Sequence, residues 1–425
     1  MPRLGFTWDA SDELTVRGGF GLYSGGNPNV WLSNAYSNDG FTNVQLRRSF
    51  DDSVFDLPLS RQGRPGYDVP QSMVDEILAT TIDNASSSRL VILDPGYEQP
   101  GEWKFALGAT WELPWWEITA DIDYLHSEMQ DPAIYVDLSQ SIVGRTADGQ
   151  PIYDYTNGRD NLMLTNSSKK PTSDAFSIVL RKDFDWGLDL TLGYAFVDAE
   201  DVNHMGSATA GSNWDNVATL DPNNVDVGDS NYVTPHRFTF RASYAKEFFT
   251  DLTTRITLAG YAKEGQGQSF VMGSGDLEGD GFFGRHLLYV PTGIDDPLVV
   301  FGPDFDTDAF FAWADRKDLS AGYVRRNEKH AAWSTRWDLR VDQELPTFID
   351  GTSAKAYVKI YNLGNLLNDE WGHVNDAEFF SVQAVDSSLD DQGRYVYEEF
   401  EGGSLNDLRE ERSLWEVRLG VEFNF

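Results

Sequence analysis

A short acidic motif in the second half of this 425-residue chain has the residue types of a calcium-binding loop. Asp276, Glu278 and Asp280 alternate along the chain, and Gly281 follows them. Calcium loops need several carboxylates at alternate positions and a glycine where the loop turns sharply. An EF-hand also needs a bidentate glutamate at the twelfth position, which is Leu287 here, and helices on both sides. The motif therefore predicts no EF-hand and, at most, a looser surface calcium site, which is our only cofactor hypothesis.

Other motifs for enzyme chemistry are weak or missing. The glycines at 279, 281 and 284 match the dinucleotide-binding spacing, but that motif must join a strand to a helix. Here it lies in an acidic loop, where Asp280 would repel a pyrophosphate. The six histidines show no ligand spacing, the chain has no cysteine, and no Gly-x-Ser-x-Gly elbow is present. We therefore expect no enzyme and no catalytic residue.

Charge and composition exclude several further classes of protein. The chain has 68 acidic and 33 basic residues, a formal net charge of −35. Nucleic-acid binding needs clustered lysine and arginine, so no nucleic-acid partner is expected. Aromatic residues make up 13% of the chain, which disfavours intrinsic disorder. No stretch of 18 apolar residues is present, so we expect no transmembrane helix.

Strict alternation of apolar and polar residues recurs in segments of about ten residues, the length of a tilted membrane strand. In the last segment, every second residue from Trp415 to Phe425 is apolar, and the residues between them are mostly polar. Such alternation is typical of strands with one apolar and one polar face. We predict eleven strands, at residues 3–9, 14–23, 104–112, 116–127, 175–182, 187–198, 236–246, 252–263, 335–344, 354–363 and 414–425.

Tight turns and long connections alternate between these strands. The long connections, at 24–103, 128–174, 197–236, 264–334 and 364–413, are expected to lack regular structure. Short turns at one rim and long loops at the other are typical of outer-membrane barrels. A soluble sandwich or propeller is the alternative, because its half-buried strands also alternate. Aromatic residues at the strand ends suit membrane interfaces and favour an all-β, antiparallel transmembrane barrel.

The strand count and direction predict an incomplete barrel. If the short turns face the periplasm, the last strand ends there and the first strand begins at the outer rim. A complete single-chain barrel has an even strand count and both ends in the periplasm. We therefore expect residues 1–425 to form the C-terminal part of one larger barrel domain, and the N-terminus, which lacks signal-peptide features, agrees with this expectation.

Several stretches resemble the C-terminal half of TonB-dependent outer-membrane receptors, in particular the Oar-like group, which carries a carboxypeptidase-regulatory-like domain at its N-terminus. They are PRLGFTWD and LTVRGGFGLYSG (2–9 and 14–25), WKFALGATWELPWWEITADIDYLHS (103–127), GDGFFGRHLLYVP (279–291), RWDLRVDQELP (336–346), KAYVKIYNLGNLLNDEWG (355–372) and SLWEVRLGVEFNF (413–425).

The resemblance implies a 22-stranded barrel with an N-terminal plug, of which this chain supplies the last eleven strands. It implies TonB-energised uptake of a scarce solute, such as an iron chelate, a peptide or an oligosaccharide. The plug, the first barrel half and the TonB contact would lie in the missing region. A barrel-anchored surface-binding or adhesion protein without active transport is the alternative function, and a secreted all-β carbohydrate-active protein is a third.

Arginines on the polar strand faces are the main candidates for contact inside the barrel. A charge on the lipid face would cost about 2–4 kcal/mol at the midplane, whereas a polar lumen tolerates it. These arginines contact the plug or an anionic substrate, or they form ion-pair ladders with Asp121, Asp123, Asp189, Asp338 and Asp342; ladders or plug contact are preferred. The seven are Arg17, Arg181, Arg237, Arg241, Arg255, Arg336 and Arg340.

Aromatic residues of the long connections are candidates for ligand contact, because flat rings suit sugars and apolar peptide side chains. Packing between loops, or an interfacial position close to the strands, is the preferred alternative. The candidates are Trp31, Trp214, Trp313, Trp333 and Trp371.

The terminal strand predicts contact with both lipid and the assembly machinery. Leu419, Val421, Phe423 and Phe425 share its apolar face and would face lipid. By resemblance, a C-terminal aromatic residue on such a strand looks like the assembly signal of outer-membrane proteins, which makes the barrel-assembly machinery an expected partner.

Most of the negative charge falls in the predicted long connections. They hold 50 acidic and 18 basic residues, a net charge of −32, whereas strands and tight turns are nearly neutral. We expect this acidic region to lie outside the outer membrane of a Gram-negative bacterium. There it would bind divalent cations that bridge to lipopolysaccharide or steer cationic ligands, unless it serves only solubility in a salty habitat.

Overall fold

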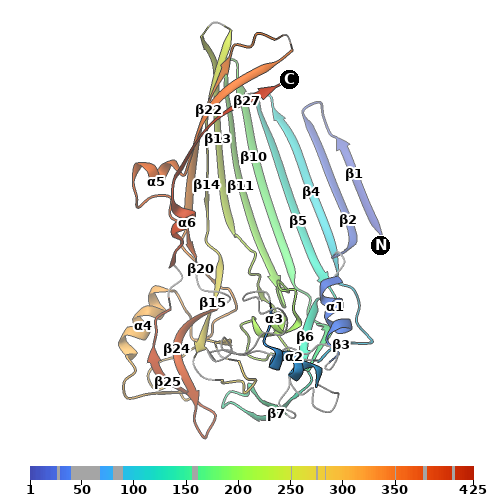
Figure 1. Ribbon diagram of the computed structural model, residues 1–425, viewed down its shortest axis with the longest axis vertical. Helices are drawn as coiled ribbons and strands as arrows, with labels where there is room; N and C mark the ends of the chain where they lie inside the picture. Colours follow the sequence, from blue (N-terminus) through green and yellow to red (C-terminus); the bar gives the residue numbers. More distant parts are fainter. Residues whose placement is uncertain are drawn as a thin grey trace.

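The structure, a computed structural model, combines a tall antiparallel sheet with a layer of folded segments at one end of it (Figure 1). It describes residues 1–25, 29–39, 68–79, 90–155, 161–249, 251–273, 276–282, 284–349, 351–376, 381–403 and 407–425. None of the helices in these ranges has the length and hydrophobicity to cross a bilayer.

The sheet is a meander in which neighbours along the chain are also neighbours in space and pair antiparallel. Its strands confirm the eleven predicted ranges, with ends that differ by a few residues, and tight turns join them in pairs. A short additional strand, β12 (Gly228–Asp229), pairs with the end of β11. The eleven strands are β1 (Arg3–Asp9), β2 (Leu14–Ser24), β4 (Gly101–Leu113), β5 (Ile118–Gln130), β10 (Thr172–Phe184), β11 (Leu188–Asp201), β13 (His236–Phe249), β14 (Leu252–Lys263), β21 (Ser334–Leu345), β22 (Ser353–Tyr361) and β27 (Glu416–Asn424).

The register sorts apolar and polar side chains onto opposite faces of the whole sheet. Leu192 on β11 lies between Leu180 on β10 and Phe240 on β13, so this row is apolar. One residue earlier, Thr191 lies between Arg181 and Arg241. A one-residue slip in any strand would exchange the two faces, so the alternation fixes the register.

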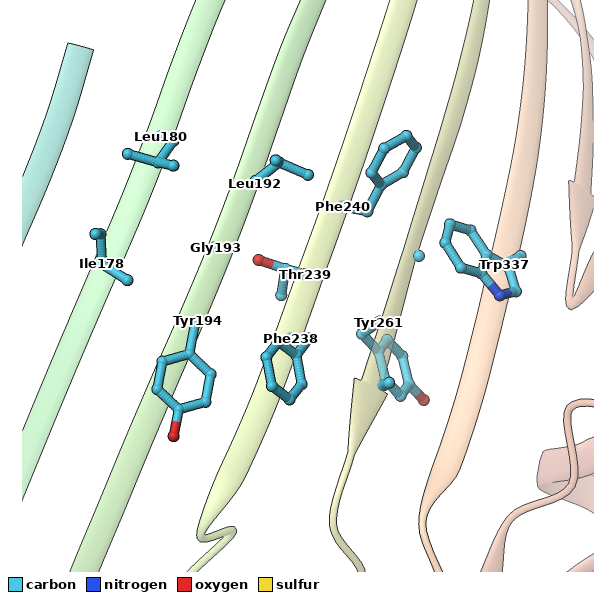
Figure 2. Close-up of a pocket in the computed structure, with 12 residues that line it drawn as sticks. Ile178, Leu180, Leu192, Gly193, Tyr194, Phe238, Thr239, Phe240, Tyr261 and Trp337 are labelled. Carbon is cyan, nitrogen blue, oxygen red and sulfur yellow. The ribbon is translucent and has the colours of Figure 1, made fainter. Parts of the chain in front are cut away.

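The apolar face is open to its surroundings and contains a shallow groove (Figure 2). Leu419 on β27 is 75% exposed and Leu107 on β4 is 45% exposed, although both are large and apolar. The groove, of about 350 Å³, crosses β10 to β21 where Gly260 lets the ring of Trp337 lie close to the backbone. An apolar surface of this extent is unfavourable in water and suits contact with lipid.

The two edges of the sheet, β1 and β27, have no strand partner on their outer sides in the described part of the chain. Both strands run in the same direction, because ten antiparallel steps separate them. Joining them directly would therefore need a parallel pair. In hydrocarbon each unpaired backbone group costs several kcal/mol, so an antiparallel barrel built from this sheet needs further strands.

The described residues of all five long connections include helices or strands, so the prediction that these connections lack regular structure is wrong. We call their described residues the loop layer. Most of the layer lies beyond one end of the sheet, whereas α5 and α6 lie beside it (Figure 1). The elements of the layer are α1 (Asn29–Ser37), α2 (Gln71–Leu78), β3 (Leu90–Leu93), β6 (Ala133–Asp137), β7 (Gln140–Arg145), β8 (Pro151–Tyr155), β9 (Asn161–Asn166), α3 (Ala210–Asp215), β15 (Gly267–Gly273), β16 (His286–Leu287), β17 (Tyr289–Val290), β18 (Val299–Phe301), α4 (Thr307–Arg316), β19 (Gly322–Tyr323), β20 (Lys329–His330), α5 (Leu363–Leu367), β23 (Asn375–Asp376), β24 (Ser381–Leu389), β25 (Tyr395–Phe400), β26 (Asp407–Leu408) and α6 (Glu410–Ser413).

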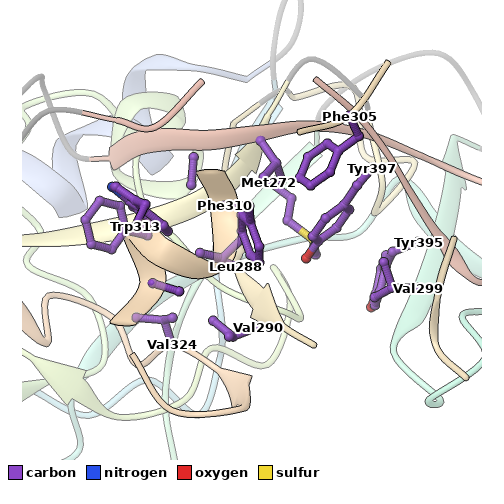
Figure 3. Close-up of a cluster of buried hydrophobic side chains, with 14 of the residues drawn as sticks. Met272, Leu288, Val290, Val299, Phe305, Phe310, Trp313, Val324, Tyr395 and Tyr397 are labelled. Carbon is purple, nitrogen blue, oxygen red and sulfur yellow. The ribbon is translucent and has the colours of Figure 1, made fainter. Parts of the chain in front are cut away.

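Contacts between different connections hold the loop layer together. The fourth and fifth connections pair in parallel, β15 with β24 and β18 with β25, and enclose a core around Phe270, Phe310 and Tyr397 (Figure 3). Residues of the first three connections form a second core, which includes Leu162 and Trp214. Because no single connection supplies a whole core, local sequence patterns did not reveal these elements.

The two faces of β4 give a direct test of the membrane orientation. Replacing Leu107, near the middle of β4 on its apolar face, with arginine should lower the free energy of unfolding in lipid bilayers by about 2–4 kcal/mol. The adjacent Ala106→Arg, on the polar face, is the matched control and should cost less than about 1 kcal/mol. Denaturant unfolding of both variants measures the difference, and equal costs would contradict a lipid-facing apolar face.

Candidate functional site

An ion-pair ladder lines the polar face of the sheet, as the sequence predicted. Each of the five predicted aspartates is paired with one of the seven arginines. Most of these pairs join two different strands, which are either direct neighbours in the sheet or separated by one strand. The side chains are about one-eighth to one-half exposed, so each pair adds little stability in water. Their main effect is to neutralise the face. The pairs are Arg17–Asp123 (2.6 Å), Arg181–Asp121, Arg255–Asp189 (3.6 Å), Arg336–Asp338 (3.0 Å) and Arg340–Asp342 (2.6 Å).

Arg237 and Arg241 do not join this ladder. The Arg237 guanidinium lies 5.3 Å from the centre of the Tyr261 ring. Among the described residues, neither arginine has a carboxylate within ion-pair distance. Contact of the seven arginines with a plug or a substrate stays a prediction, but these two are the ones left available for it.

The acidic motif predicted as a loose calcium site is largely buried within the loop layer, not placed on the surface. Glu278 is 1% exposed and Asp280 is fully buried. An oxygen of Asp280 lies 2.6 Å from an Arg285 nitrogen, and an oxygen of Glu278 lies 2.9 Å from His286 Nδ1. Each of these carboxylates thus lies beside a guanidinium or an imidazole ring, so the arrangement does not need a metal ion.

Asp276, the third member of the motif, closes the local turn. Both of its carboxylate oxygens accept backbone hydrogen bonds, from the N–H groups of Asp280 and Gly281, each at 2.9 Å. Gly281 has φ of 83°, a conformation that favours glycine. The alternating acids and glycine thus build a turn that places Asp280 against Arg285, and calcium binding by this motif stays a prediction.

Arg285 links this turn to Trp214 of the third connection, a residue of the second core. Its guanidinium stacks 4.2 Å from the centre of the Trp214 ring, and its Nη1 donates to the Trp214 carbonyl at 3.1 Å. Its contact with Asp280 is close but poorly aligned for a hydrogen bond, so we describe it as an ion pair. Burial raises the pKa of Asp280 to about 7, while the Arg285 charge opposes that rise.

A chain of polar side chains continues from His286 and joins three connections. His286 Nε2 lies 3.3 Å from the Tyr395 hydroxyl, which lies 2.6 Å from the Tyr323 hydroxyl. Both tyrosines donate hydrogen bonds to Asp148. Burial raises the pKa of both hydroxyl groups, which keeps them protonated as donors. The chain fixes the second, fourth and fifth connections to one another.

Three other carboxylates come close together at a position that sequence spacing did not indicate. Oxygens of Asp386, Glu399 and Glu401 lie within 4.8 Å of one another among the described residues. Pairing of β24 with β25 places Asp386 opposite Glu399. The acids come together only through that strand pairing. Glu399 and Glu401 are exposed, and exposed acidic groups often occur close together without a metal ion.

The five tryptophans predicted for ligand contact divide into packed and exposed residues. Trp214 and Trp313 are 3% and 4% exposed and belong to the two main cores. Trp31 packs against the edge of the core that contains Trp214. These three follow the loop-packing alternative, and the rings of Trp214 and Trp313 are not free to stack on a ligand. Trp333 and Trp371 are about half exposed, and Trp333 stacks on His236 at the rim of the sheet.

A cavity of about 480 Å³ lies in the loop layer between the second, third and fourth connections. Its lining mixes charged and apolar side chains, which suits a solute of mixed character. The sequence did not predict it, because its residues come from distant segments. Lining residues include Lys169, Thr219, Asp226, Leu287, Tyr323, Arg325 and Arg326.

The comparison with protein families agrees with an outer-membrane sheet. The family described as outer membrane beta barrel domain matches residues 1–370. No curated protein matches the sequence. Among solved structures, the outer membrane transporter YddB from Escherichia coli is similar with a TM-score of 0.45 and 13% sequence identity. The match covers 98% of this chain and 39% of the transporter, so the chain spans about two-fifths of that protein's length.

Arg285 should be required for a stable loop layer. At pH 8, Arg285→Met leaves the buried Asp280 carboxylate without its cation and should destabilise the layer by about 3–5 kcal/mol. Limited proteolysis and hydrogen exchange of β8 and β16 measure the loss. The exposed Arg325→Met is the matched control and should cost less than about 1 kcal/mol. Arg285→Met with Asp280→Leu should recover much of the stability, and a fully stable Arg285→Met would contradict the role of the pair.

Asp280 should also give the loop layer a pH dependence. Its pKa is higher in the folded protein than in the unfolded chain, so the folded state binds the proton more tightly. The resulting stability is present at low pH and is lost as the pH rises through about 7. In the natural protein, the loop layer should be on the order of 1 kcal/mol more stable at pH 6 than at pH 8. The Asp280→Asn variant should lack this difference. Hydrogen exchange at the two pH values tests this, and equal pH profiles for the two proteins would refute it.

Proposed function

The chain belongs to the outer membrane beta barrel domain family and is an outer-membrane protein, and on that premise we propose that it forms part of an outer-membrane importer. The imported solute would be one too large or too scarce for passive pores. Energy would come through TonB, acting on a plug and a first barrel half that these residues do not include. The family membership supports the location in the outer membrane.

One observation carries the proposal, namely the charged polar face of the sheet opposite its apolar face. Paired arginines and aspartates continue along this face from β2 to β21, between the tight turns and the loop layer. Such a face needs water or polar protein beside it, because charges facing lipid are costly. A sheet with such a polar face would line the lumen through which the solute passes.

The two unpaired edges support the proposal that the barrel is larger than this sheet. Because β1 and β27 run in the same direction, further strands are needed to connect them in an antiparallel barrel. Eleven additional strands would give the 22-stranded class that encloses a plug. A plug would also supply polar groups to the inner face.

A surface-binding or adhesion protein is the second candidate function. The loop layer has hydrophobic cores of its own, which the passage of a solute does not require. A stable layer of this size would suit binding of a partner outside the cell. In that case the sheet would serve only as an anchor.

Uptake by intact cells separates these functions. Cells with and without the natural protein are given labelled iron chelates, peptides or oligosaccharides, before and after dissipation of the proton-motive force. We expect the protein to increase accumulation of one class by about tenfold or more, and we expect the increase to vanish when the force is dissipated. Surface binding without accumulation would contradict import and support the anchor.

A further inference from the structure

Three cations on the polar face of β13 and β14 lack the acidic partners that the rest of the ladder has. They are Arg237, Arg241 and Lys263, which we call the cationic patch. Among the described residues, none of the three has an ion pair or a side-chain hydrogen bond. Arg237 and Arg241 are exposed, and Lys263 is half-buried. The patch is therefore a local positive charge in a protein with a formal net charge of −35.

The register sets two of these cations against each other. Arg237 pairs directly with Lys263 across the ladder between β13 and β14. Directly opposed side chains have Cβ atoms about 4.5–5.5 Å apart, and like charges in this arrangement are destabilising. The other neighbours of the pair along this row are Ala195 and Ser334, which offer no charge. An anion between the two cations would relieve the repulsion.

Neutral donors and small residues surround the patch. Thr239 lies between the two arginines on the same face, and Tyr261 is its partner on β14. The Thr239 hydroxyl occupies the space above Gly193, where a Cβ would lie only 2.5 Å from it. The face thus presents guanidinium, ammonium and hydroxyl donors in one area, which suits an acceptor with several oxygens.

The patch lies at the end of the sheet where a solute would arrive from the loop layer. His236 begins β13 and Lys263 ends β14, so Arg237 and Lys263 lie where the sheet meets the loop layer (Figure 1). Arg241 lies four residues further into the sheet, about 13 Å along the strand. A solute that leaves the loop layer along the polar face would meet the paired cations first and Arg241 next.

We propose that the cationic patch binds a small polyanionic solute, one that carries several carboxylate or phosphate groups. The acidic loop layer, with its net charge of −32, repels anions at a distance. Only an anion that contacts several cations at once is retained against that field, which selects for multiple charges. The assignment of this ligand rests on the proposed function in one respect, because the bound anion would be the solute taken up.

The test measures binding alone, without transport. The full natural chain in detergent at low salt is titrated calorimetrically with citrate and, in a separate arm, with inorganic pyrophosphate. We expect one of the two to bind, and we expect Arg237→Gln with Arg241→Gln to weaken that binding at least tenfold, about 1.4 kcal/mol. Arg17→Gln with Arg181→Gln removes two arginines that are already paired and is the matched control, with a change below twofold.

The outcomes decide whether the cationic patch binds a ligand or has only a structural role. Replacement of both arginines with lysine keeps the charge and should retain binding within a few-fold, which excludes a simple folding defect. Absence of binding of both probes to the natural protein would overturn the proposal, as would an equal loss in the control. In that case the arginines would neutralise carboxylates of another polypeptide segment. This experiment measures binding and not uptake, so a failure of import in cells would not change its result.

Discussion

The need to pair every backbone hydrogen-bonding group in hydrocarbon determines the architecture of this protein. Strands satisfy that need only in an unbroken ladder, and the meander from β1 to β27 supplies one through ten antiparallel pairs. The same ladder places alternate side chains on opposite faces, so a sequence period of two becomes one lipid face and one polar face. In the described part of the chain the outer sides of β1 and β27 have no strand partner, and the larger barrel that we propose would supply one.

The charges follow from this division. On the polar face, five arginine–aspartate pairs keep the wall close to neutral, whereas the loop layer holds nearly all of the excess negative charge. Two exceptions stand out against this background. The Asp280–Arg285 pair is buried in the loop layer and links the third and fourth connections. The cationic patch lies on the polar face of β13 and β14, and no carboxylate of the described residues pairs with it.

The sequence predicted those features that depend on neighbouring residues along one strand. Alternation located all eleven strands, and the polar parity of Arg17 and Asp123 placed both in the predicted ladder, where they form an ion pair. The loop layer depends on contacts between distant segments, such as β15 with β24 or Arg285 with Trp214, for which no local period exists. Hence an acidic motif that suggested a surface calcium site is a buried ion-pair turn, and Trp214 and Trp313 are core residues.

Cysteine cross-linking between the sheet edges tests the central claim most directly, namely that β1 and β27 border further strands of one barrel. The chain has no cysteine, so introduced pairs have no competing thiol within these residues. A set of single cysteines along β1 is combined with a set along β27 in the full natural protein, in outer membranes. Direct ladder neighbours have Cα atoms about 5 Å apart and form disulfides readily. The account predicts no disulfide in any combination, and efficient cross-linking of one register would show that these eleven strands close on themselves.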